Sequence, residues 1–323
     1  MVNLSQAVNS GLRTAMEEDP TVLVMGEDVG TLGGVFRVTD GLQKDFGDAR
    51  VMDTPLAESG IVGTAIGLAL RGYRPVCEIQ FDGFVYPAFN QIVSQLAKLH
   101  ARTNGRSRVP VVIRIPVGGG IGAVEHHSES NEAYFAHTAG LRVVCCATPN
   151  DAHWMIRQAV ACDDPVIFYE PKRRYWTKGE VTTDAEAVLP LDRASILRAG
   201  TDLTVLTYGG TVQTCLAAAD AAKAEGRDLE VIDLRSLAPL DLDTITASVT
   251  RTRRAVIVHE APVFAGLGAE VAAAVTEACF YDLEAPIVRV GGLNMPYPPA
   301  KLEAQYLPDL DRVLDGVDRA FQW

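Results

Sequence analysis

This chain of 323 residues has few of the features that mark disulfide-rich, metal-binding or membrane proteins. Its six cysteines include no CxxC pair, and most lie in apolar runs where cysteine acts as a small core residue, so neither a disulfide framework nor a zinc site is expected. No run reaches the roughly 18 apolar residues of a membrane span, and the first residues contain no apolar signal segment. We therefore expect a cytoplasmic protein without a membrane partner.

Basic residues are also scarce. The chain has 29 Lys and Arg against 41 Asp and Glu, a net charge of -12, so its surface is not attractive to a phosphate backbone or to acidic lipids. This excludes nucleic acid as a partner. Apolar residues make up 48% of the sequence, which at this length is enough for two ordinary cores.

Short apolar, β-branched runs alternate with helical stretches in the first half of the chain. Unbroken runs of this kind are typical of strands buried on both faces, and the alternation predicts a parallel α/β sheet. Helices are expected at residues 85–103 and 151–163. The predicted strands are TVLVMGED, ARVMDTP, RPVCEIQF, VPVVIRIP, LRVVCCATP and DPVIFYEP.

The pattern becomes polar and aperiodic at residues 172–200, which indicates a linker, and then the alternation resumes. The later strands are DLTVLTYGG, LEVIDLRSL, RAVIVHEAP and PIVRVGG, with helices near 211–226 and 266–280. We therefore predict two α/β domains, at residues 1–185 and 186–323. The proline- and tyrosine-rich segment 294–309 is expected to be an ordered surface coil.

Glu58 stands at the head of the small and aliphatic run SGIVGTAIGLALRG, which contains no other carboxyl group. Packed beside such a helix, the carboxyl group should be buried, with its pKa above the usual value of about 4.3, so that it exchanges a proton near neutral pH. Alternatively, Thr54 and Pro55 resemble a helix cap and a first helical position. A capping box would need Glu or Gln at the position of Ala57. The segment alone leaves a structural acid and a functional acid equally open.

Polar and aromatic side chains follow the ends of two predicted strands. In EIQFDGFVYPAFNQ, Gln80 and Phe84 would face a crevice at the carboxyl end of a strand, and GEDVG places Glu27 and Asp28 at the end of another. An aromatic core cluster is the alternative interpretation. A strand-end amide such as Gln80 nevertheless needs a hydrogen-bond partner if it is buried.

A glycine-rich loop, GGGIGAVEHHSESNEAYFAH, places His126 and His127 beyond the end of another predicted strand. The glycines do not have the G-x-G-x-x-G spacing of a dinucleotide site. A metal site built on His126, His127 and His137 is possible, but adjacent histidines on an extended loop point in opposite directions and no HExxH motif occurs. These histidines therefore indicate catalysis, binding or no function.

Five runs together resemble the beta subunit of the thiamine-diphosphate-dependent 2-oxo acid dehydrogenases: MGEDVG, VMDTPLAESGIVGTAIGLAL, EIQFDGFVYPAFNQIVSQ, HHSESNEAYFAHTAGLRVV and DPVIFYEPKRRY. They occur in the family's order and spacing, and the resemblance covers essentially the whole chain. HHSES followed by NEAYFAH is closer to the branched-chain type than to the pyruvate type. The resemblance implies a transketolase-like fold, with a pyrimidine-binding domain and a smaller C-terminal domain, and a role in branched-chain amino acid catabolism.

The resemblance also assigns roles to residues. Glu58 would hydrogen-bond the aminopyrimidine nitrogen of thiamine diphosphate and favour the tautomer that activates the thiazolium carbon. Phe84 would pack on the pyrimidine where most branched-chain members carry Tyr, so any contact of that hydroxyl group is lost. His127 would act on the reacting centre during decarboxylation or reductive acylation of lipoamide. The rest of the cofactor pocket would be Glu27, Leu56, Ala57 and Gln80, and the substrate side Phe81, Phe84, His126 and His127.

The family's magnesium-binding GDG turn does not occur in this chain. The resemblance therefore implies an alpha subunit that holds Mg²⁺ and the diphosphate, an alpha-two beta-two heterotetramer, and no activity of this chain alone. It also implies docking to a lipoyl acyltransferase core. A structural K⁺ ion would be held by backbone carbonyl groups of Val111, Val112, Ala159, Cys162 and Asp164.

The sequence thus predicts oxidative decarboxylation of a branched-chain 2-oxo acid with acyl transfer to lipoamide. The alternatives are the beta subunit of pyruvate dehydrogenase, a metal-dependent hydrolase built on the His126, His127 and His137 cluster, and a non-catalytic partner that only buttresses another subunit.

Overall fold

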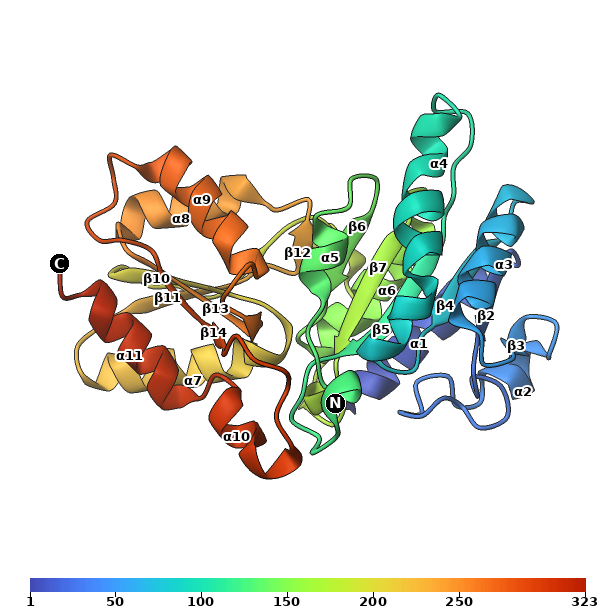
Figure 1. Ribbon diagram of the computed structural model, residues 1–323, viewed down its shortest axis with the longest axis horizontal. Helices are drawn as coiled ribbons and strands as arrows, with labels where there is room; N and C mark the ends of the chain where they lie inside the picture. Colours follow the sequence, from blue (N-terminus) through green and yellow to red (C-terminus); the bar gives the residue numbers. More distant parts are fainter.

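The computed structural model describes residues 1–323, and in it two α/β halves lie side by side (Figure 1). The predicted α/β class is confirmed, and every apolar run identified above contains a strand. These runs form strands because β-branched side chains that are buried on both faces pack well on an extended, pleated backbone.

The first half of the chain is built on a seven-stranded sheet with the order β12-β6-β7-β5-β4-β2-β3. All neighbouring strands are parallel except β12, which runs antiparallel to β6. The strands are β2 (Val22–Gly26), β3 (Val51–Asp53), β4 (Arg74–Glu78), β5 (Val112–Val117), β6 (Arg142–Cys145), β7 (Val166–Pro171) and β12 (Ser236–Ala238).

Helices cover both faces of this sheet. One face packs against α1 (Leu4–Glu18) and α6 (Pro149–Ala161), and the other against α3 (Glu58–Leu70) and α4 (Ala97–Arg102). The predicted helix at 151–163 is α6. The remaining helices of this half are α2 (Leu42–Phe46) and α5 (Glu132–Ala136).

The helix predicted at residues 85–103 is divided into three segments. A 3-10 helix, η1 (Asp82–Ala88), is followed by a π-helical segment, η2 (Gln91–Leu96), and then by α4. Pro87 lies inside η1, where its missing N–H group disfavours a continuous α-helix. As a result, the residues that follow β4 form a separate turn at the end of the sheet.

The second half contains a five-stranded sheet with the order β14-β13-β10-β11-β9, in which only β9 is antiparallel. Its strands are β9 (Ser195–Arg198), β10 (Leu203–Thr207), β11 (Leu229–Asp233), β13 (Ala255–Pro262) and β14 (Val288–Gly292). Its helices are α7 (Val212–Ala224), α8 (Leu242–Thr252), α9 (Leu267–Cys279), α10 (Glu303–Tyr306) and α11 (Leu310–Ala320).

The two halves share a hydrophobic core. One cluster of 38 buried residues runs from α3 in the first half to α9 in the second. Strand β12 follows the second half's β11 in the chain yet pairs with β6 of the first sheet. The expected linker contains two short strands, β8 (Lys178–Gly179), which pairs with β1 (Val2–Asn3), and β9.

The segment 294–309, expected as surface coil, contains two short helical turns, η7 (Ala300–Leu302) and α10. Tyr297, Tyr306 and Leu307 from this segment are buried together. None of the helices has both the length and the apolar character that a membrane crossing requires.

Candidate functional site

The predicted site residues gather at the carboxyl ends of the central strands. The chain passes from β2 outward to β3 and then returns to β4 on the other side of β2, so the loops after β2 and β4 diverge. In open α/β sheets such a switch in direction creates a crevice where ligands bind. Gln80, in the loop after β4, connects this loop to the loop after β2. Its Nε2 atom donates to the Asp28 carboxylate at 3.1 Å and to the Glu27 carbonyl oxygen at 3.5 Å.

Glu58 is buried, as expected, with 6% of its surface exposed. It is the first residue of α3, and the N-cap is Ala57, which makes no side-chain cap. The alternative in which Thr54 and Pro55 open the helix is therefore wrong. The backbone N–H groups at the start of α3 favour a negative charge at this position.

Glu27 forms a second carboxyl group beside Glu58. It is 9% exposed, and its Oε1 atom is buried without a hydrogen-bond partner. Burial raises the pKa of Glu27, and the neighbouring charges of Glu58 and Asp28 raise it further. A carboxyl group with a raised pKa holds its proton more tightly than an exposed glutamate does, so Glu27 is suited to donate a hydrogen bond from its protonated form. The sequence had singled out Glu58 alone as the proton-exchanging acid.

Four aromatic rings from two segments form the neighbouring part of the site. His127 lies 4.2 Å from Phe81 and 5.0 Å from Phe84, measured between ring centroids, and both pairs are edge-on. His126 lies 4.3 Å from His127 and 5.8 Å from Phe84. Phe36, which the sequence did not single out, packs edge-on against Phe81 at 5.6 Å. The structure thus brings both histidines onto the η1 turn.

His127 belongs to a short 3-10 turn, η3 (Glu125–His127), and its Nδ1 atom is buried without a hydrogen-bond partner. Burial lowers the pKa of His127, and the charges of His126 and Lys172 lower it further, while Glu125 acts in the opposite direction. The imidazole is therefore predominantly neutral near pH 7, with one ring nitrogen available to accept a proton.

Beneath Phe81 lies a buried ion pair that the sequence did not reveal. Lys172 donates to Asp82 and, at 3.1 Å, to the carbonyl oxygen of Pro116, and both charged side chains are 0% exposed. The Lys172 ammonium group lies 5.9 Å from the Phe81 ring centroid. Burial raises the pKa of Asp82 to about 7 despite the opposing charge of Lys172. Both residues occur in runs quoted above, but nothing in those runs shows that they meet.

A second buried charge network lies under the same strand ends. Arg114 donates to both oxygens of Glu170, at 2.6 and 2.8 Å, and to Glu78 at 2.6 Å. Tyr175 donates to Glu170 at 2.7 Å. The Arg114 guanidinium group thus binds two carboxylates, and each carboxylate accepts at least one hydrogen bond. Buried charges are tolerated when they are paired and hydrogen-bonded in this way.

Two of the predicted pocket residues are on the surface of this chain. Leu56 is 79% exposed and Ala57 is also exposed, although both directly precede the buried Glu58. The start of α3 therefore changes from exposed to buried between Ala57 and Glu58.

The metal-site alternative is wrong. The structure contains no group of three or more His, Cys, Asp or Glu side chains that could hold a metal ion. His137 lies apart from the other two histidines. It follows α5 and lines a cavity of about 1090 Å³ together with residues of α9 and β12. The sequence placed the three histidines close together along the chain, but the folding of the loop separates His137 from His126 and His127.

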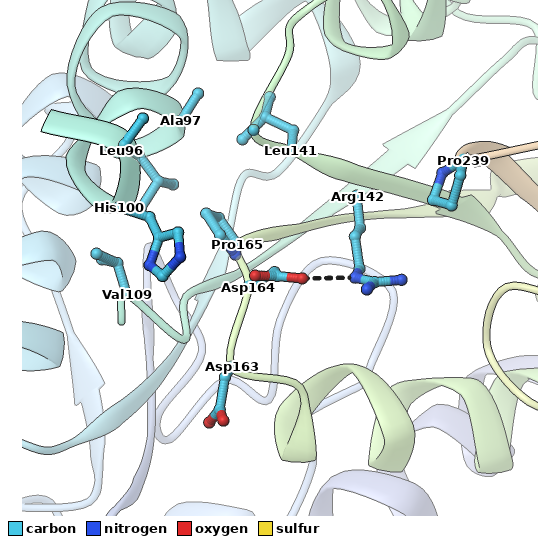
Figure 2. Close-up of a pocket in the computed structure, with 12 residues that line it drawn as sticks. Leu96, Ala97, His100, Val109, Leu141, Arg142, Asp163, Asp164, Pro165 and Pro239 are labelled. Carbon is cyan, nitrogen blue, oxygen red and sulfur yellow. Dashed lines mark hydrogen bonds and ion pairs between the residues drawn. The ribbon is translucent and has the colours of Figure 1, made fainter. Parts of the chain in front are cut away.

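The carbonyl groups expected to hold K⁺ lie at the opposite, amino-terminal edge of the first sheet. There the Val111 oxygen accepts from Val166 N–H at 2.9 Å, and the Cys162 oxygen accepts from Arg74 at 3.0 Å. Figure 2 shows the adjoining pocket of about 290 Å³, in which Arg142 donates to the Asp164 carboxylate at 2.9 Å. A K⁺ ion here stays a prediction.

Two family models match this chain. The model described as "Transketolase, pyrimidine binding domain" matches residues 1–177, and that described as "Transketolase, C-terminal domain" matches residues 192–313. A solved structure titled "Split gene transketolase, inactive beta4 tetramer" shares the fold, with a TM-score of 0.80 at 22% identity over 99% of this chain and 98% of that one.

Several curated proteins are similar over more than nine-tenths of their length. A "Pyruvate dehydrogenase E1 component subunit beta" from Leifsonia xyli is 61% identical, covering 98% of this chain and 94% of the relative. A "3-methyl-2-oxobutanoate dehydrogenase subunit beta" from Mycobacterium tuberculosis is 56% identical, covering 99% and 92%. A "2-oxoisovalerate dehydrogenase subunit beta" from Pseudomonas aeruginosa is 47% identical, covering 99% and 95%.

Proposed function

This chain belongs to the E1 beta subunits of the 2-oxo acid dehydrogenases, which are built on the two transketolase domains, and we propose that it acts on a branched-chain 2-oxo acid. The reaction would be oxidative decarboxylation, with the acyl group passed to lipoamide on an acyltransferase core in the cytoplasm. The observation that carries the reaction is the placement of two buried carboxyl groups beside an aromatic and histidine cluster at the switch point of the sheet, and the branched-chain substrate is supported by the relatives named for such substrates at 56% and 47% identity.

The residues at this site fit thiamine diphosphate. Glu27 offers a buried carboxyl oxygen without a partner, and its raised pKa favours hydrogen bonding to a ring nitrogen. Glu58 would hold the aminopyrimidine, Phe84 would pack against its face, and Gln80 would line the same pocket with Leu56 and Ala57. When bound, the cofactor supplies a carbon nucleophile for the oxo group of the substrate.

The protein's own residues would move and place protons. Glu58 would hydrogen-bond the ring nitrogen and exchange a proton with it, and Glu27, whose pKa is raised by burial, would supply a second carboxyl group that holds a proton nearby. His127, predominantly neutral, would exchange a proton with the reacting substrate, while its contacts with the rings of Phe81 and Phe84 would hold the imidazole in place.

Two features support a requirement for an alpha subunit. The exposed Leu56 and Ala57 adjoin the buried Glu58, so a partner surface placed there would cover apolar residues and enclose the carboxyl groups. The chain also contains no GDG run. The alpha subunit would hold Mg²⁺ and the diphosphate in a heterotetramer of two alpha and two beta chains. A K⁺ ion on the backbone carbonyl groups at the opposite edge of the sheet is part of the same proposal.

The decisive experiment is Glu58→Gln in the chain reconstituted with its alpha subunit. The amide keeps the size of the side chain but cannot exchange a proton, so turnover should fall about 10²- to 10⁴-fold while the assembly keeps its mass. Glu17→Gln, at an exposed glutamate on α1, is the matched control and should leave turnover unchanged. Wild-type turnover in the Glu58 variant would contradict a catalytic role and would leave this chain only a structural role in the assembly.

The alpha-subunit requirement has its own test. The isolated wild-type chain should neither bind thiamine diphosphate tightly nor turn over, and measurable decarboxylation by the chain alone would contradict the half-site proposal. Calorimetric titration of the cofactor into the chain with and without the alpha subunit separates these outcomes.

Pyruvate is the second candidate substrate, because the relative at 61% identity is named for it. Steady-state kinetics of the reconstituted enzyme with pyruvate and with 3-methyl-2-oxobutanoate decides between them. A pocket distinguishes one extra methylene by about 1–3 kcal/mol, or about 10- to 200-fold, and the branched substrate has two more carbon atoms than pyruvate, so we expect kcat/KM to favour it by at least about tenfold.

A further inference from the structure

The glycine-rich run before the two histidines has no role in the site described so far. It opens a loop that is closed at its base by a hydrogen bond from Gly118 N–H to the Glu129 carbonyl oxygen at 2.9 Å. Within the loop, His127 N–H donates to the Val124 carbonyl oxygen at 3.0 Å. Since Nδ1 of His127 has no partner, the position of this imidazole depends on the loop backbone and on the rings that it touches.

Two carboxylates from the second half of the chain bind the amides of this run. Glu303 accepts from Gly120 N–H at 2.8 Å with one oxygen and from Gly122 N–H at 3.1 Å with the other. Tyr297 donates its hydroxyl group to Glu303 at 2.7 Å and orients it. Glu260 accepts from Gly119 N–H. Backbone amides and a carboxylate form charge-assisted hydrogen bonds, which are stronger than those between neutral groups.

The glycines are required by this contact. A Cβ atom at Gly119 would overlap the Tyr297 hydroxyl group, and one at Gly118, whose φ is +80°, would collide with the Glu260 carboxylate. The loop and the second half therefore approach each other more closely than side chains on the loop would allow. The glycine-rich run, which does not have the spacing of a dinucleotide site, is thus a contact between the two halves of the chain.

We call the hydrogen bonds from the N–H groups of Gly119, Gly120 and Gly122 to Glu260 and Glu303 the glycine latch. We propose that this latch fixes the loop and that, through it, Glu303 is a positioning residue for His127. This inference rests on the proposed function of His127, whereas the latch itself is a property of the fold. The second half of the chain would then be part of the catalytic site without touching the substrate.

The latch is tested first in the full-length chain, without cofactor. Glu303→Ala should accelerate hydrogen exchange of peptides spanning residues 118–124 by about tenfold or more, because two amides lose a charged acceptor. Glu277→Ala, at an exposed glutamate on α9, is the matched control and should leave their exchange unchanged. Unchanged exchange in Glu303→Ala would overturn the latch whatever the chain's function.

The positioning role is tested in the chain reconstituted with its alpha subunit. Glu303→Ala should lower kcat about 10- to 100-fold, since small displacements of a reacting group are costly, with the affinity for thiamine diphosphate unchanged because Glu27 and Glu58 stay in place. Glu303→Gln keeps one acceptor oxygen and should recover part of kcat.

These readouts separate the possible failures. Faster exchange with wild-type kcat would overturn the positioning role while the latch stands. A fall in cofactor affinity equal to the fall in kcat would also overturn it, since this indicates a general loss of structure. If the reconstituted wild-type enzyme has no 2-oxo acid turnover, the proposed function fails, and the exchange experiment still decides the latch.

Discussion

The buried pair Lys172–Asp82 makes the energetics of the site directly testable. Lys172→Met removes the ammonium group that donates to Asp82 and to the Pro116 carbonyl oxygen, while the methionine fills much the same space. Both side chains are 0% exposed, so water cannot replace the lost partner. Asp82 would be left with a buried charge or would have to bind a proton.

The expected loss of stability follows from this burial. Removing one partner of a buried ion pair costs about 3–5 kcal/mol, whereas replacing both by uncharged residues of similar size is often neutral or stabilising. Asp82→Asn together with Lys172→Met should therefore restore the free energy of unfolding to within about 1 kcal/mol of wild type or above it.

The cost should also depend on pH. The pKa of Asp82 lies near 7 in the folded chain and at 3.8 in its usual state, so the folded state binds this proton more tightly. The stability contributed by the proton is complete below pH 3.8 and is lost as the pH rises through about 7. Without Lys172 the pKa of Asp82 rises further. Lys172→Met should therefore destabilise the chain less at pH 5.5 than at pH 8.

Urea unfolding at the two pH values, followed by circular dichroism, measures these differences. Lys44→Met, at an exposed lysine on α2, is the matched control and should change the free energy of unfolding by no more than about 0.5 kcal/mol. The reasoning is refuted if Lys172→Met is as mild as this control at pH 8, or if the double variant is less stable than Lys172→Met alone.

Three further predictions concern the histidine turn. His127→Ala should lower turnover about 10²- to 10⁴-fold with cofactor binding retained in calorimetry, and loss of cofactor binding would mean that its role is different. Because the charge of His126 lowers the pKa of His127, His126→Ala should move the acidic limb of the rate profile upward, toward 6.5, and an unmoved limb would contradict this. At Gly83 a Cβ atom would collide with the His126 carbonyl oxygen, so Gly83→Ala should destabilise the chain by about 1–3 kcal/mol and lower kcat. Gly67→Ala on α3, where the space around the Cβ is open, should be neutral or stabilising, and equal behaviour of the two variants would refute the contact.

The sequence by itself was sufficient for the strands in the apolar runs and for the helices α3, α6, α7 and α9, whereas the strands β1, β8, β9 and β12 and the helices α1, α8 and α11 were not predicted. Apolar β-branched runs specify buried strands locally, and a polar residue just after such a run must lie at the sheet edge. Glu27, Gln80 and Phe84 were identified in this way, whereas Glu58 was identified from the small and aliphatic run that follows it. The helix predicted at residues 85–103 was divided into three because Pro87 acts within the segment, a feature that the periodicity did not resolve.

Only the tertiary structure decided which distant residues meet. Asp82 and Lys172 are 90 positions apart, and Gly120 and Glu303 are 183 apart. Local sequence patterns report burial and periodicity, but they carry no information on pairings that arise from strand order and from the packing of one half on the other. His137 was placed with the wrong partners for the same reason. The raised pKa of Glu27 likewise depends on its burial and on the charge of Glu58 from another element, which the residues next to Glu27 in the sequence do not supply.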